Sequence, residues 1–196
     1  MSSENTPSDL PGGTDPRTLR ALAHPVRLDL LYLLEREGQL TAGRAADLLG
    51  LTPKVCSYHL NQLSSYGIVE ETGTGKGRSR PWRLAINGLS YVHDPNEQAT
   101  TRRSADAFAK TMLARDSQLI DSFIDGRHRL PHAWRNVSTL SSTPLRLTPG
   151  QLRELGQELT RLVDRYRTIA AEPDTDTHPA HISVYAIPTD LADLTE

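Results

Sequence analysis

The sequence predicts an α+β fold that is mainly helical, with its candidate function concentrated in the first half of the chain. Three observations lead to this prediction. Apolar residues recur at helical spacing in most segments. Start and stop signals bracket these segments. One Gly-rich stretch between two β-prone runs, at residues 73–77, marks a hairpin. With 196 residues, the chain can form one large domain or two small ones.

Four short helices are predicted after residue 14. Each opens at a residue whose side chain can cap a helix, or at a proline that suits the first helical turn, and glycines close three of them. The second helix is rich in leucine, so we expect it to be buried on more than one side. The start and stop residues, in chain order, are Asp15-Pro16, Pro25 and Gly38, Thr41 and Gly50, and Thr52-Pro53 and Gly67.

A β-hairpin follows the fourth helix. Residues 68–72 and 81–85 are β-prone and flank a glycine-rich loop that carries Lys76, Arg78 and Arg80. Consecutive helices, a short turn between the third and the fourth, and a basic hairpin together make a winged helix-turn-helix. We assign this domain to residues 15–88.

Residues 89–196 are predicted to be mainly helical with a few strands. A start signal at 94–97 opens a long amphipathic helix to about Arg129, and a capping box at 148–151 opens another to Ile169. Residues 145–147 and 182–187 have β character. We expect this region to serve dimerisation. A small-molecule effector pocket is the alternative use of its apolar stripes, lined by Phe108, Met112, Phe123, Trp134 and Tyr166.

The charge of the chain is unevenly distributed. The formal net charge is −2, yet residues 17–84 contain ten Lys or Arg against six Asp or Glu. The segments on either side carry an acidic excess. A basic excess confined to the predicted winged helix indicates a polyanionic partner for that segment.

The predicted fourth helix, residues 53–66, has two chemically different faces. Cys56, Leu60 and Leu63 follow the i, i+4, i+7 spacing of a buried stripe. The opposite arc offers hydrogen-bond donors and acceptors that suit base edges in the major groove, and the wing, 72–81, suits phosphates or a narrow minor groove. The DNA-contacting residues that we predict are Thr52, Lys54, Val55, Ser57, Tyr58, His59, Asn61, Gln62, Lys76, Arg78 and Arg80.

The stretch Leu19-Arg20-Ala21-Leu22-Ala23-His24-Pro25-Val26-Arg27 resembles the opening signature of ArsR-type winged-helix transcriptional regulators. Residues 51–69 are similar to that family's recognition helix and its exit into the wing. The resemblance covers about 17–85, and the later residues more loosely resemble a larger branch of such regulators. It implies a homodimer on a palindromic operator, most often acting as a repressor.

The single cysteine, Cys56, is the residue at which metal or redox chemistry would take place. Metal sensors of the resembled family carry cysteine pairs on the helix before the recognition helix, and residues 42–49 contain none. Cys56 and His59 supply two ligands where a structural zinc site needs about four. We expect Cys56 to be a small buried hydrophobe, with a redox-sensing thiol or a metal ligand as alternatives. His59 is expected to pack or contact phosphate rather than sense pH. No cofactor is expected.

The N-terminus lacks the basic residues and the apolar run of a signal peptide, and a single cysteine cannot form an intramolecular disulfide. We therefore expect a cytoplasmic protein that begins with a disordered arm, residues 1–14. Catalytic motifs such as Gly-x-Ser-x-Gly and HExxH are absent, so we expect no enzyme.

We predict a sequence-specific DNA-binding transcriptional regulator, a homodimeric repressor whose partner is double-stranded DNA. The alternative is a winged-helix module for protein–protein interaction, with a ligand-sensing C-terminal region and no specific DNA binding, because a fold alone does not settle function.

Overall fold

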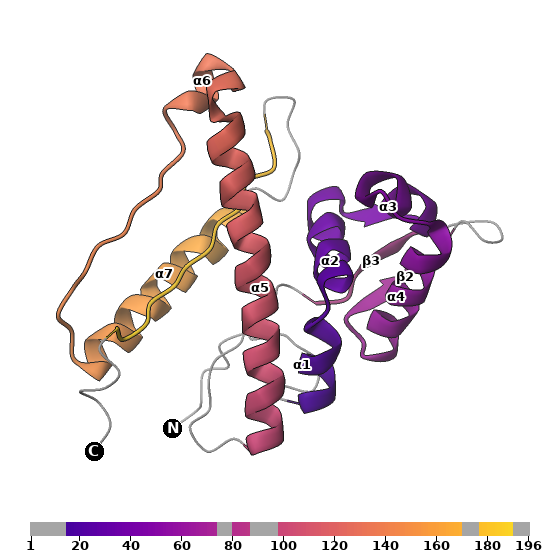
Figure 1. Ribbon diagram of the computed structural model, residues 1–196, viewed down its shortest axis with the longest axis horizontal. Coiled ribbons are helices and arrows are strands. Elements are labelled where there is room, and N and C mark those ends of the chain that lie inside the picture. The colour runs from indigo at the N-terminus through magenta and orange to yellow at the C-terminus, as the bar shows by residue number, and fades with distance from the viewer. Residues whose placement is uncertain (1–14, 74–79, 87–97, 170–176, 190–196) are drawn as a thin grey trace. The chain divides into compact units, whose positions relative to one another are not determined.

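A computed structural model describes residues 15–73, 80–86, 98–169 and 177–189 (Figure 1). The chain divides into two compact units, 1–125 and 126–196, which are described separately. The predicted arm, 1–14, lies outside the described residues. The elements of the described residues are α1 Pro16–Leu22, α2 Pro25–Glu37, β1 Gln39–Leu40, α3 Ala42–Leu49, α4 Pro53–Ser65, β2 Val69–Glu71, β3 Trp82–Leu84, α5 Ala99–Gly126, a 3-10 turn Arg127–Arg129, α6 His132–Arg135 and α7 Pro149–Ile169.

The helix boundaries of the first unit follow the predicted capping residues. Asp15, Thr41 and Thr52 each accept, at a side-chain oxygen, a hydrogen bond from a backbone N–H two or three residues later. These bonds satisfy donors that the first turn of a helix leaves unpaired. Gly38 and Gly50 end α2 and α3 with positive φ angles of 74° and 63°. Glycine adopts this conformation without a steric penalty. The four predicted helices are confirmed as α1 to α4.

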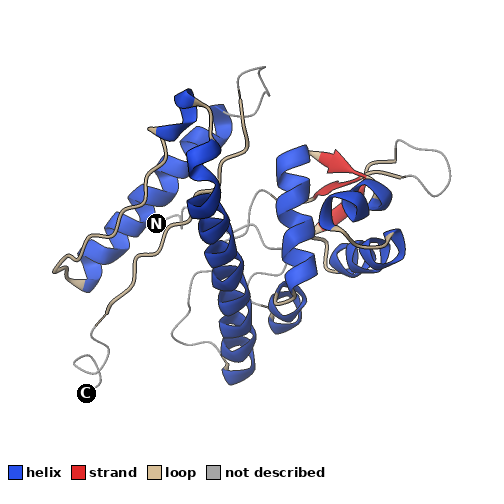
Figure 2. Ribbon diagram, turned by 45° about the horizontal axis from the view of Figure 1, so that its top comes forward, coloured by secondary structure: helices blue, strands red, loops and turns tan. Residues whose placement is uncertain are grey.

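A small antiparallel sheet completes the first unit. Its strand order is β1-β3-β2, with Trp82 opposite Leu40 on one side and Glu71 on the other. Figure 2 shows these short strands beside α2. The hairpin of β2 and β3 confirms the sequence prediction, whereas β1 was not predicted. Two residues are too few to display the alternation that identifies a strand.

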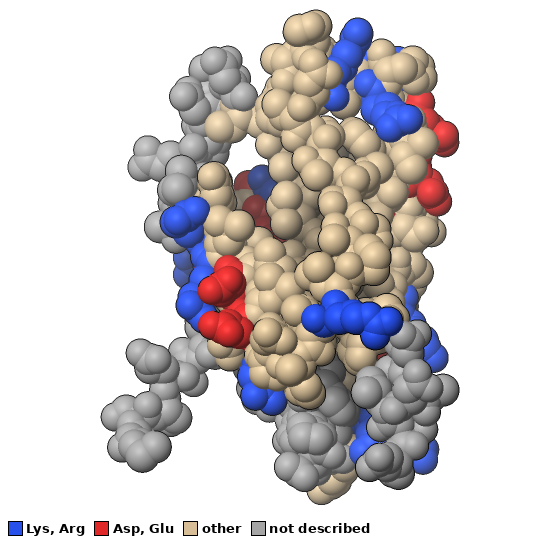
Figure 3. All heavy atoms as spheres, turned by 90° about the vertical axis from the view of Figure 1, so that its left-hand side faces the viewer, with Lys and Arg blue, Asp and Glu red and all other residues tan. Residues whose placement is uncertain are grey.

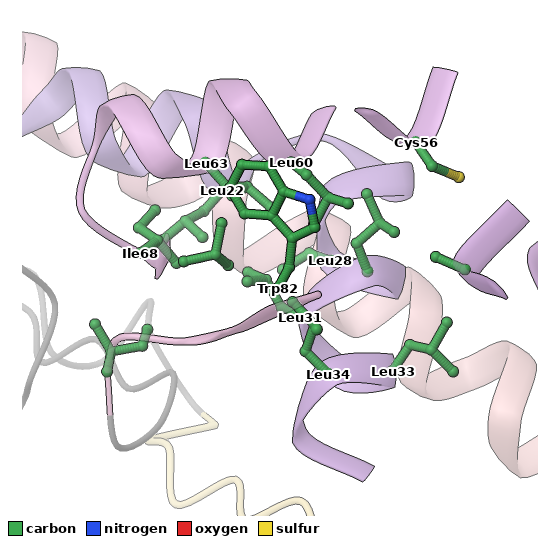
Figure 4. Packing of buried hydrophobic residues seen from close by; sticks show 14 of the residues in the cluster. Leu22, Leu28, Leu31, Leu33, Leu34, Cys56, Leu60, Leu63, Ile68 and Trp82 are labelled. Carbon is green, nitrogen blue, oxygen red and sulfur yellow. The ribbon is translucent and has the colours of Figure 1, made fainter. Parts of the chain in front are cut away.

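The core of the first unit forms between α2 and the inner face of α4. Leu28 and Leu31 of α2 and Leu60 and Leu63 of α4 are each at most 1% exposed. Trp82 of β3 lies among them (Figure 4). Burying one leucine side chain stabilises a fold by roughly 1.5–3 kcal/mol, so this contact fixes α4 against the rest of the unit.

The long helix α5 belongs to the same core. Phe108 is 1% exposed within the cluster of leucines. Farther along the helix, Arg115 donates to Asp29 of α2 at 3.1 Å, and its guanidinium lies 3.6 Å from the centroid of the Tyr32 ring. The first compact unit therefore extends beyond residue 88, where we predict the DNA-binding domain to end. That functional boundary remains a prediction.

The second unit confirms one helix start and corrects two predicted strands. The N–H of Thr148 donates to Gln151 Oε1 at 2.9 Å and the N–H of Gln151 donates back to Thr148 Oγ1 at 3.3 Å, which is the predicted capping box of α7. The predictions of strands at 145–147 and 182–187 are wrong. β-propensity reflects the fit of side chains to a half-buried pleated surface, and these segments are exposed, with Ile187 at 70%.

Candidate nucleic-acid interface

The turn between α3 and α4 sets the direction of α4. The N–H groups of Gly50 and Leu51 both donate to the carbonyl of Ala46, which closes the end of α3. Ala45 and Ala46 are buried at 0% and 1% exposure. Their small side chains let α3 pack closely against α4. This packing and the two hydrogen bonds to Ala46 fix the turn, so α4 begins in a fixed orientation.

The two faces of α4 are separated by burial as the sequence predicts. Cys56, Leu60 and Leu63 are fully buried, whereas the Tyr58 side chain is 58% exposed. Asn61 is exposed and its side-chain amide donates to the carbonyl of Ser57 at 2.7 Å, which holds it along the helix. The other predicted contact residues of this segment are exposed or half-buried, and they are Thr52, Lys54, Val55, Ser57 and Gln62.

His59 is a correction to the predicted DNA-contacting set. Its ring is 8% exposed and lies 4.5 Å, centroid to centroid, from that of His24. Its Nδ1 accepts a hydrogen bond from Arg27 Nε at 3.5 Å. His59 follows Cys56 by three positions and precedes Leu63 by four, a spacing that already places it on the buried side. We therefore remove His59 from the interface.

Both arginines in the described part of the β2–β3 hairpin form ion pairs. Arg80 pairs with Glu71 at 3.0 Å, and Arg83 pairs with Glu70, the residue opposite it in the sheet. The Arg80 side chain is still 57% exposed. Exposed ion pairs contribute only about 0–1 kcal/mol, so Arg80 can exchange its partner for a phosphate at little cost. The predicted contacts Lys76 and Arg78 lie outside the described residues.

Figure 3 shows how charged side chains are distributed over one face of the protein. Lys and Arg atoms there are scattered among acidic and uncharged residues, and they do not gather into a basic surface on the part of that face that is described. The basic excess of residues 17–84 is a count from the sequence.

Cys56 is a packing residue. Its side chain is 0% exposed, and burial raises the pKa of the thiol. A buried, protonated thiol is a poor nucleophile and a poor metal ligand. Among the described residues, no group of three or more His, Cys, Asp or Glu side chains is placed to hold a metal ion. The structure thus supports the interpretation of Cys56 as a small hydrophobe.

Residues predicted to line an effector pocket have different environments. Phe108 is buried in the core of the first unit and Met112 packs against it, so Phe108 is not available to a ligand. In the second unit, Trp134 meets the His178 ring edge-on at 5.2 Å between centroids, and Tyr166 is 60% exposed. The effector pocket remains a prediction, without Phe108.

Comparison with known proteins identifies the first unit more closely. A family model described as a helix-turn-helix domain matches residues 22–72, from the last residue of α1 through β2. No curated protein matches the chain. Helix-turn-helix domains of this kind are DNA-binding regulatory domains, so the match indicates a DNA-binding regulator. Within the described ranges, no helix combines the length and apolar character needed to cross a bilayer.

The state of Cys56 gives a first prediction. We expect the wild-type thiol to react with an Ellman-type reagent only after unfolding in urea, because the folded protein buries it fully. Cys56→Val should keep the same melting temperature within a few degrees, since valine fills a similar volume. Rapid stoichiometric labelling of the native protein would show that the thiol is accessible and that the packing interpretation is wrong.

The histidine pair gives a pH prediction. Burial and the nearby Arg27 charge lower the pKa of His24, and burial, His24 and Arg27 lower that of His59. In the unfolded chain both titrate near pH 6.5, so below that pH the unfolded state binds more protons. The free energy of unfolding should therefore be highest above about pH 6.5 and fall as the pH drops toward the folded-state values.

Urea titrations between about pH 8 and about pH 5 measure this dependence. His59→Gln should flatten the slope, whereas His128→Gln, at an exposed position, should leave it unchanged. An identical slope in His59→Gln and the wild type would contradict the assignment.

Proposed function

We propose that the protein is a sequence-specific DNA-binding transcriptional regulator of the cytoplasm that acts as a homodimeric repressor on a palindromic operator. In this proposal α4, within the recognition segment 53–66, enters the major groove, and the wing, 72–81, contacts flanking phosphates or the minor groove. The observation that carries the proposal is the separation of α4 into a fully buried apolar face and an exposed polar face, within a helix-turn-helix domain.

The exposed face of α4 has the chemistry for base recognition. Lysine donates to guanine acceptors, and glutamine or asparagine can bond adenine through two atoms. Lys54, Asn61 and Gln62 supply these groups, and the exposed Tyr58 adds a ring and a hydroxyl between them. Thr52 Oγ1 caps α4 by accepting a hydrogen bond from the N–H of Val55. The other N–H groups in the first turn of α4 favour a phosphate. These features support α4 as the reading element.

A second copy of the chain is the partner that we propose for the exposed apolar side chains of α5 and, separately, for those of α7. In α5, Leu119, Ile120 and Ile124 are 36–42% exposed, and in α7 Leu162 is 44% exposed. Exposed apolar side chains grouped on a helix mark interaction surfaces. The resemblance to ArsR-type regulators implies the same homodimer. A small-molecule effector that acts through the C-terminal region remains part of the proposal.

Selection from random DNA duplexes tests the function directly. We expect the purified protein to enrich a palindromic motif at moderate salt. Tyr58→Ala should then lose about 1–3 kcal/mol of binding to that motif, roughly 5- to 150-fold, and accept more bases at the contacted position. Its melting temperature should be unchanged because Tyr58 is exposed. Tyr58→Phe separates the ring from the hydroxyl. Failure to enrich any motif would favour the protein-interaction alternative.

The wing gives a separate prediction. Arg78→Ala with Arg80→Ala should weaken binding to all sequences and lower the slope of log affinity against log salt by up to about 2, because each phosphate contact contributes about 0.9. Arg36→Ala with Arg103→Ala, two exposed positions outside the wing, is a control of equal charge. A salt slope equal to that of the control would show that the wing arginines do not contact the DNA backbone.

A further inference from the structure

A basic hollow lies beside the recognition helix. It has a volume of about 260 Å³ and is formed by α1, the start of α2 and the last turns of α4. Its polar lining consists of Arg17 and Arg20 of α1, His24 and Arg27 around the start of α2, and Gln62 and Tyr66 from α4 and its C-cap. Among the described residues, no carboxylate lines it. None of the three arginines belongs to the set of DNA-contacting residues predicted from the sequence.

The arginines of the hollow form no ion pair with the described residues. Arg27 donates from Nη1 to the carbonyl of Ala21 at 2.8 Å and from Nε to His59 Nδ1 at 3.5 Å, and both acceptors are neutral. These bonds orient the guanidinium without neutralising it. Arg17 and Arg20 are exposed and make no ion pair within the described ranges. The described arginines of the hairpin, Arg80 and Arg83, differ, since each has a glutamate partner.

Two further groups line the hollow. His24 is one of them, and its Nδ1 is buried from solvent with no hydrogen-bond partner among the described residues. Gln62 belongs both to the hollow and to the exposed arc of α4. A ligand held in the hollow would therefore touch the helix that we propose reads bases.

We propose that this hollow is a phosphate-binding site formed by Arg17, Arg20 and Arg27, with His24 and Gln62 in its wall. Guanidinium groups match the paired oxygens of a phosphate and bind it through two bonds at once. The volume holds a phosphate group with a small substituent. The phosphate has two sources, a DNA backbone diester next to the recognition helix or a free phosphorylated compound. The first source rests on the proposed function, and the second does not.

The DNA arm uses full-length Arg17→Ala with Arg20→Ala, two exposed positions whose loss leaves the core intact. With the selected duplex, this variant should lower the salt slope by about 2 relative to the wild type and leave the sequence preference unchanged. Arg36→Ala with Arg103→Ala is the matched control, because it removes equal charge from exposed residues outside the hollow. This result identifies backbone phosphate as the ligand.

The small-anion arm needs no DNA and so remains decisive if the proposed function fails. Pyrophosphate binding is measured by calorimetry at low ionic strength, with chloride of equal ionic strength as the reference. Binding by the wild type and by the control, but not by Arg17→Ala with Arg20→Ala, identifies a free phosphate as the ligand. Arg27→Lys keeps the charge but loses the paired donors, and it should weaken this binding severalfold.

Either pattern supports the site. The proposal is overturned if the variant of the hollow matches the control in both arms, in salt slope and in pyrophosphate binding. Melting curves of each variant confirm that a lost signal does not come from unfolding.

Discussion

The packing of α4 against α2 is the contact on which the rest of the first unit depends. Leu60 and Leu63 are fully buried against the leucines of α2, and this burial decides which side of α4 turns outward. The side chains of Tyr58 and Asn61 are exposed as a consequence. A shift of one residue in this packing would rotate the helix by about 100° and place the same polar groups in the core. The apolar contact thus defines the surface that can read DNA.

Charge adds a second constraint, and the structure distributes it differently from the sequence-based expectation. The wing contacts predicted from the sequence are Lys76, Arg78 and Arg80, and in the structure Arg80 pairs with Glu71. Arg17, Arg20 and Arg27 line the hollow beside α4 without an ion pair among the described residues, and neutral acceptors orient Arg27. Because nucleic-acid affinity is dominated by phosphate contacts, the phosphate site that we propose in this hollow and the predicted contact Lys54 would both raise the affinity for DNA.

Features encoded within one helix were predictable from the sequence. Caps such as Thr41 and Thr52 depend on residues within a single turn, so their spacing identifies them. Features that need a distant partner were not. Residues 182–187 have β character, but a strand needs a sheet, and the sheet of the described residues consists of β1, β3 and β2 alone. The hollow joins α1 to the end of α4, about 40 residues apart, and no local pattern records that meeting.

An alanine series along residues 53–65 tests the assignment of α4 as the reading helix. The melting temperature and the affinity for the selected duplex are measured for each variant. We expect the variants to fall into two separate sets, one that loses stability and one that loses affinity. Replacing Leu60 or Leu63 should lower the free energy of unfolding by roughly 2–5 kcal/mol, as is usual for a buried leucine. The melting temperature should fall accordingly. Replacing Lys54, Tyr58 or Gln62 should lower affinity at unchanged stability. Full affinity in every outward-facing variant would contradict the assignment of α4 as the reading helix.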